Sequence, residues 1–86
     1  METQNIVIPI VHLNGTSRKS LIAQREEFYS KLFSAARALC EMGPNGRDYY
    51  PEPGRMEKAI AQHERRLSIL RDLLAEIETE IGMLAE

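Results

Sequence analysis

The sequence has a single cysteine, no long apolar run and no surplus of basic residues, and each lack excludes a class of protein. The lone Cys40 excludes an internal disulfide framework and is typical of a reducing compartment. No apolar run approaches the roughly 20 residues that cross a bilayer. The first residues also lack the basic region and apolar stretch of a signal peptide. These features predict a cytoplasmic protein with no membrane partner.

The charge balance is slightly acidic, with 11 Lys/Arg against 13 Asp/Glu. Proteins that grip duplex DNA through its phosphates carry a basic face, so duplex nucleic acid is not an expected partner. The acidic surplus lies in residues 56–86, where four Lys/Arg stand against seven Asp/Glu. A small anionic ligand held by a few local cations is compatible with this distribution.

Catalytic motifs are missing as well. No Ser or Cys nucleophile has an identifiable base, and there is no glycine-rich phosphate loop or pair of carboxylates placed by a motif. His12, Cys40 and His63 are too dispersed for a zinc site. The sequence therefore predicts a protein that is not an enzyme and needs no metal or cofactor.

Proline and glycine divide the chain. Three of the four prolines and three of the five glycines lie in residues 43–54, so neither a helix nor a central strand runs through this segment. Apolar residues at helical spacing lie on either side of it. We expect one all-α domain over residues 1–86, an antiparallel helical hairpin. Its predicted parts are an N-terminal strand or arm 1–14, a helix 16–42, a turn 43–54 and a helix 55–85.

The first predicted helix has Thr16 or Ser17 as its N-cap. Arg25 falls on the apolar stripe of this helix, where Leu or Ile would be expected. Two interpretations are open for Arg25. It forms an ion pair with a carboxylate of the second helix, or it contacts a ligand.

The second predicted helix carries a heptad seam that would face the first helix. Steps of four and three residues join Met56, Ile60, His63, Leu67, Leu70, Leu74, Ile77, Ile81 and Leu84. A fold about Tyr49 would place His63 opposite Ala35 and Ala36, as a packed neutral side chain or, alternatively, as a ligand group. Three carboxylates are expected to form a solvated face: Glu76, Glu78 and Glu80.

Apolar residues also lie beside this seam, more than one partner helix can cover. They are Ala59, Ile69, Leu73 and Met83. Burying a further Leu or Ile stabilises an assembly by about 1.5–3 kcal/mol, which favours association. Residues 6–13 read as a short strand that is apolar on both faces, with no second strand in the chain to pair with. We therefore predict a homo-oligomer formed through the second helix and the N-terminal strand.

The candidate ligand-binding residues are cations, hydroxyls and phenols in three clusters. They are His12, Asn14, Thr16, Ser17, Arg18, Lys19, Arg25, Arg47, Asp48, Tyr49 and Tyr50. Cations and free N–H groups at a helix start are typical of phosphate or carboxylate sites, and tyrosines can stack on a base. One hairpin holds its helix start and its turn at opposite ends, so a shared pocket requires an antiparallel second copy. The alternatives are cations that face solvent, an Arg47–Asp48 ion pair and tyrosines that cap the core.

The segments His12-Leu13-Asn14-Gly15-Thr16-Ser17 and Pro44-Asn45-Gly46-Arg47-Asp48-Tyr49-Tyr50-Pro51, set around two helices, resemble a class of small helical-hairpin proteins. These proteins are common in tailed-phage and prophage genomes, and the similarity covers most of residues 8–80. More loosely, the chain is similar to phage anti-defence sponges, which sequester the nucleotide second messengers of CBASS and Thoeris immunity between subunits. The resemblance implies non-catalytic nucleotide capture in the host cytoplasm. The alternative is a protein-binding hairpin, either an inhibitor of a host enzyme or a small phage assembly part.

Overall fold

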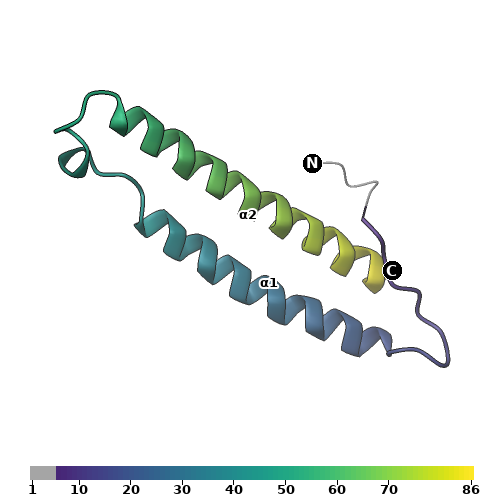
Figure 1. Ribbon diagram of the computed structural model, residues 1–86. Helices are drawn as coiled ribbons and strands as arrows, with labels where there is room; N and C mark the ends of the chain where they lie inside the picture. The colour runs from purple at the N-terminus through teal and green to yellow at the C-terminus, as the bar shows by residue number, and fades with distance from the viewer. Residues whose placement is uncertain (1–5) are drawn as a thin grey trace.

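The computed structural model describes residues 6–86, which fold as a hairpin of two long antiparallel helices (Figure 1). Helix α1 spans Arg18–Glu41, a short 3₁₀ helix η2 spans Gly46–Asp48, and helix α2 spans Arg55–Ala85. No strand is formed within residues 6–86. The molecule is a rod of 62 × 23 × 17 Å. The predicted all-α hairpin is confirmed.

Local chemistry sets the limits of α1. Ser17 has an extended backbone, and its Oγ accepts a hydrogen bond from the Ser20 N–H at 3.1 Å, so it is the N-cap. The helix thus begins at Arg18, two residues after the start of the predicted range. At the other end the Gly43 N–H donates to the Cys40 carbonyl at 3.1 Å, which tightens the last turn. Pro44 follows and cannot continue the helix.

Helix α2 begins after Gly54, which has φ +86°. This left-handed conformation is strained for any residue with a Cβ, so glycine is needed at this position. No side chain caps the helix, and it continues to Ala85. At 1.5 Å per residue, the 31 residues of α2 extend about 46 Å and the 24 of α1 about 36 Å.

The core between the helices is thin. Leu21, Leu32 and Leu84 are the buried hydrophobic residues of the described chain. Of the nine residues in the predicted seam of α2, only Ile60 is exposed, at 40%, and the others are buried or half-buried. The seam therefore faces α1 as its heptad spacing predicts.

The register of the hairpin differs from the expected one. A fold about Tyr49 would set Arg25 opposite Leu73, but Arg25 pairs with Glu80, seven residues further along α2. His63 likewise does not face Ala35 and Ala36, because its Nε2 lies 3.6 Å from the position that a Cβ on Gly43 would occupy.

The physical reason lies in the tip, residues 43–54. Tyr49 lies against the first turns of α2 and lines one pocket with residues as far along as Gln62, so the chain reverses nearer to Pro53 than to Tyr49. A slip of seven residues is one heptad, which leaves the same seam facing α1. The heptad pattern alone cannot distinguish these two registers.

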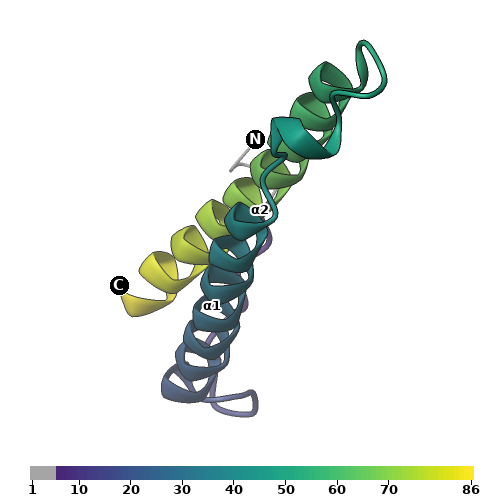
Figure 2. The same cartoon turned by 90° about the vertical axis from the view of Figure 1, so that its left-hand side faces the viewer.

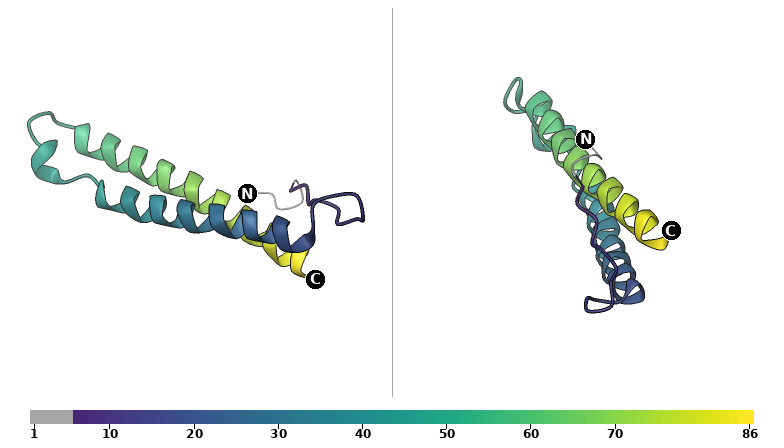
Figure 3. Two further views of the ribbon diagram at one scale, coloured as in Figure 1. Left: turned by 90° about the horizontal axis from the view of Figure 1, so that it is seen from below. Right: turned by 90° about the vertical axis from the view of Figure 1, so that its right-hand side faces the viewer.

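The arm, residues 6–16, turns back at the start of α1 and lies beside the end of α2 (Figures 1 and 3). Its turn is closed by a hydrogen bond from the Gly15 N–H to the His12 carbonyl, at 3.1 Å. A Cβ on Gly15 would lie 2.7 Å from His12 Nε2, so a larger residue at position 15 would make the exposed imidazole shift. Figure 2 shows the helix axes diverging towards this end, where Leu21 and Leu84 are buried.

The arm does not alternate as a strand would. Val7, Ile10 and Leu13 are 86%, 81% and 98% exposed, a spacing of three residues rather than two. Residues 6–12 have no regular secondary structure within the single chain. A strand formed by pairing with a second copy stays a prediction, and the part of it in residues 1–5 lies outside the described residues.

Candidate functional site

The predicted ligand-binding residues separate into two groups at the two ends of the rod, with Arg25 between them (Figure 1). His12, Asn14, Thr16, Ser17, Arg18 and Lys19 lie in the arm and the first turn of α1, and all are exposed. Arg47, Asp48, Tyr49 and Tyr50 lie at the tip. The length of α1, about 36 Å, separates the groups, so one chain does not bring them together.

At the start of α1, some polar side-chain atoms are hydrogen-bonded within the chain and others are not. The Ser17 hydroxyl is occupied, since it caps the helix and also donates to Ser20 Oγ at 3.0 Å. Arg18 and Lys19 form no ion pair with any residue of the described chain. The expected cations are therefore present and unneutralised, in a geometry that suits either solvent or an anion.

Arg25 makes its polar contacts within the hairpin. Its Nε donates to Glu80 Oε1 at 2.9 Å, and its Nη1 donates to the Leu21 carbonyl at 3.3 Å. The side chains of Arg25 and Glu80 are only 23% and 14% exposed. Of the two interpretations left open by the sequence, the ion pair with a carboxylate of the second helix is confirmed. The Arg25 guanidinium is therefore engaged within the hairpin rather than exposed to a ligand.

The expected solvated carboxylate face on α2 is confirmed for Glu78, which is exposed and accepts a hydrogen bond from the Tyr29 hydroxyl at 3.4 Å. The expectation is wrong for Glu80, which pairs with Arg25 at the helix boundary, and Glu76 is half-buried. Glu26, Tyr29, Glu78 and Ile81 line a hollow of about 430 Å³. Its carboxylates make it unsuited to an anionic ligand.

At the tip, hydrogen bonds fix the backbone of η2 but leave its polar side chains free. Asn45 Oδ1 accepts from the Arg47 N–H at 3.1 Å and so caps η2. The suggested Arg47–Asp48 ion pair is not formed, because Arg47 pairs with no carboxylate of residues 6–86. Tyr50 is 78% exposed, whereas Tyr49 is half-buried. The tip thus presents a free guanidinium and a free phenol to the outside.

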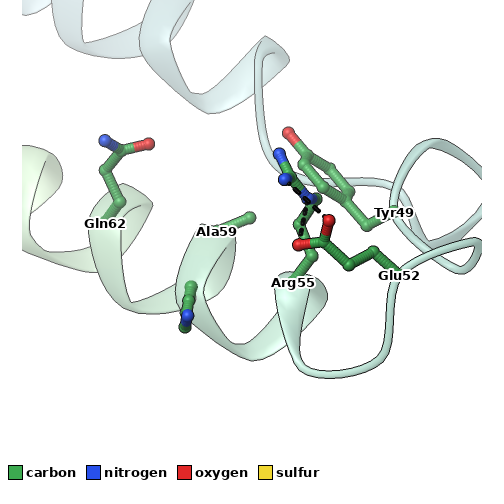
Figure 4. A pocket seen from close by; sticks show the side chains of 6 residues that line it. Tyr49, Glu52, Arg55, Ala59 and Gln62 are labelled. Carbon is green, nitrogen blue, oxygen red and sulfur yellow. Dashed lines mark hydrogen bonds and ion pairs between the residues drawn. The ribbon is translucent and has the colours of Figure 1, made fainter.

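A pocket of about 310 Å³ opens where the tip meets α2 (Figure 4). Its lining residues are Tyr49, Glu52, Arg55, Lys58, Ala59 and Gln62. Arg55 and Glu52 form a two-pronged ion pair, with Nε–Oε2 at 2.8 Å and Nη2–Oε1 at 3.0 Å. The pair neutralises Arg55, so Lys58 supplies the surplus positive charge of the pocket.

Sequence reasoning identified only Tyr49 among these lining residues. Arg55 precedes Lys58 and Ala59 by three and four residues, and these precede Gln62 by four and three, which places all of them on one face of α2. That spacing was readable in the sequence. What it faces, however, depends on the register of the hairpin, which the heptad pattern does not fix.

Two classes of site can be assessed directly in the part of the chain that the structure describes. Among residues 6–86, no three His, Cys, Asp or Glu side chains gather as a metal site would require. Neither described helix has a stretch that is both long and apolar enough to span a membrane.

The sequence matches no protein-family model, no curated protein and no solved structure. What this chain binds must therefore be inferred from its own residues.

Proposed function

We propose that this chain is a non-catalytic binding protein that acts as a homo-oligomer and holds a small anionic ligand of nucleotide type where copies meet. The observation that carries the proposal is the surface left open by a single copy. The chain exposes 6650 Å², whereas a compact monomer of 9.8 kDa exposes about 5,200 Å². The hairpin is too thin to cover its own apolar residues.

The size of this excess fits a specific interface. Residues 1–5, counted as fully extended chain, account for at most about 900 Å² of it. The excess is therefore between about 600 and 1,500 Å² per chain. One partner buries about 800 Å² in a standard interface and more in an obligate homodimer, so the open surface matches what a second copy would cover.

The ligand chemistry follows from the free groups at the two ends. Arg18, Lys19 and Arg47 have no carboxylate partner in residues 6–86, and Tyr50 offers an exposed ring. Cations make charge-assisted hydrogen bonds to phosphate, and a phenol ring stacks on a base. An antiparallel second copy would bring these groups to the same end of the assembly. Together with the resemblance to phage proteins, this favours sequestration of a nucleotide immune messenger, an anti-defence function in the host cytoplasm.

Titration calorimetry against cyclic di- and trinucleotides and ADP-ribose derivatives tests the proposal. We expect heat with at least one of them, and loss of that heat in Lys19→Ala and Arg47→Ala without a change in the melting temperature of the free protein. Lys31→Ala is the matched control, since Lys31 is an exposed cation already paired with Glu27 at 3.3 Å. No heat and no thermal shift with any of these ligands would contradict the proposal.

A second candidate is a protein-binding hairpin, an inhibitor of a host enzyme or a small phage assembly part. The arm favours it, because three nearly fully exposed apolar side chains, Val7, Ile10 and Leu13, would suit a foreign surface as well as a second copy. Light scattering separates the candidates. A closed oligomer supports ligand capture between copies, whereas a monomer over a wide concentration range supports a foreign protein partner.

A further inference from the structure

A second stripe runs along α2, beside the seam that faces α1. Its members recur at alternating steps of three and four residues, the spacing of a second heptad seam. We call it the outer stripe: Gln62, Arg66, Ile69, Leu73, Glu76 and Glu80. Ile69 at its centre is 53% exposed, Gln62 and Arg66 are exposed as well, and Leu73, Glu76 and Glu80 are half-buried. A helix with two such seams side by side suits a corner of a four-helix bundle, whereas a hairpin alone needs only one.

The outer stripe is chemically self-complementary when read in opposite directions. Ile69 and Leu73 lie equally far on either side of residue 71, and so do Arg66 and Glu76. Two stripes laid antiparallel about that level would set Ile69 against Leu73 of the other copy. They would also set Arg66 against Glu76 of the other copy, twice by symmetry. An isologous two-fold interface requires such self-complementarity.

We infer that two copies of this chain pair antiparallel through the outer stripes of their α2 helices, with the two-fold axis near residue 71. The inference rests on the homo-oligomer proposed above and adds its surface and orientation. Charge along α2 supports it. Residues 55–71 carry five Lys/Arg against two Asp/Glu, and residues 72–86 carry five Asp/Glu and no Lys/Arg. Antiparallel pairing places each half against its opposite, whereas parallel pairing places like charges together.

Within the described residues only two of these charges have an ion-pair partner, Arg55 with Glu52 and Glu80 with Arg25. Cations near the start of a helix and anions near its end both oppose the helix dipole. Helix α1 neutralises only one of these charges, because Arg25–Glu80 is the one ion pair between the two helices in the described residues. The cations of residues 55–71 form no ion pair with α1 in that part of the chain.

The neighbouring helix presents apolar residues on the same side of the hairpin. Tyr29 bonds Glu78 at one edge of the helix contact, and Phe28 lies about 100° back around α1, at the other edge. Phe28 and Ala35 lie seven residues apart along that edge, Met42 at the C-cap of α1 continues the spacing, and all three are exposed. In the antiparallel pair this row would meet its copy, closing a bundle of four helices.

The pairing also joins the separated ligand groups. The two ends of α2, Arg55 and Ala85, lie 16 and 14 residues from the axis, about 24 and 21 Å along the helix. The tip of one copy would therefore stand level with the start of α1 in the other. Arg47 of one chain and Lys19 of the other would flank one site, two sites per dimer.

Charge swaps test the surface. Arg66→Glu sets like charges against Glu76 of the other copy, so we expect the dissociation constant, measured by light scattering and analytical ultracentrifugation, to rise by about tenfold or more. The double variant Arg66→Glu/Glu76→Arg should restore it. The control pair Glu64→Arg/Arg71→Glu lies on the opposite face of α2 and should leave it unchanged. Circular dichroism checks that each variant is folded.

Disulfide trapping tests the orientation, in a Cys40→Ser background. Arg66→Cys/Glu76→Cys should oxidise to a covalent dimer, while neither single variant should. A covalent dimer from either single variant would indicate a parallel pairing and overturn the inference. If Arg66→Glu does not weaken association, the pairing through the outer stripe is wrong, but the proposed homo-oligomer still stands. If the wild-type protein is a monomer at all concentrations, both the pairing and the homo-oligomer are wrong.

Discussion

The two ends of the hairpin are built in different ways. At the arm end, Leu21 and Leu84 are buried, and the arm folds back over the diverging helices. At the tip no residue is buried, α2 starts without a side-chain cap, and a pocket of about 310 Å³ opens between loop and helix. The contrast predicts that the arm end contributes more to the stability of the hairpin than the tip does.

The largest effect should come from truncating a buried residue at the arm end. Leu84 is 3% exposed, so Leu84→Ala should lower the free energy of unfolding by about 2–4 kcal/mol through lost burial and the cavity left behind. Met56 is a half-buried seam residue in the first turn of α2, next to the tip, and Met56→Ala should lower the free energy of unfolding by clearly less. Urea unfolding at one fixed protein concentration measures both, since association makes stability depend on concentration. Equal losses at the two ends would refute the contrast.

A smaller loss is expected from the ion pair that joins the two helices, Arg25–Glu80. Arg25→Ala would leave the carboxylate of Glu80, only 14% exposed, without its partner, and should cost about 1–3 kcal/mol. The exposed Lys31–Glu27 pair is the control, and Lys31→Ala should cost a few tenths of a kcal/mol, roughly. If both substitutions cost the same, the half-buried pair has no special part in joining the helices.

The sequence predicted the helices better than their alignment. Ser17, Gly43 and Gly54 mark the ends of the helices by local chemistry, and the heptad spacing of α2 identifies the face that meets α1. The register was wrong by one heptad, because the seam is unchanged by that slip and the path of the tip decides it. Arg25 carried part of the missing information, since it is a lone charge on the apolar stripe of α1 and its pairing with Glu80 distinguishes the two registers.

The candidate site shows the same limit. The sequence placed Arg47, Tyr49 and Tyr50 in the tip. It did not show that Tyr49 lines a pocket with Lys58 and Gln62, because that depends on the path of the tip. The cations at the start of α1 were identified from local chemistry alone. Whether the two groups form one site depends on a second copy, which no local pattern in one chain can specify.

The smallest effects compare the two capping side chains, one at each end. Ser17→Ala removes the hydroxyl that accepts from the Ser20 N–H, and should cost about 1 kcal/mol of unfolding free energy, because a 24-residue helix frays from its first turn. Asn45→Ala removes the equivalent bond to the Arg47 N–H in a three-residue 3₁₀ helix, where little packing depends on it. We expect this change to lower the free energy of unfolding by roughly a few tenths of a kcal/mol, because the freed N–H of a solvent-exposed turn can donate to water instead. Should Asn45→Ala prove the costlier change in urea unfolding, the tip would be an ordered part of the fold rather than its less stable end.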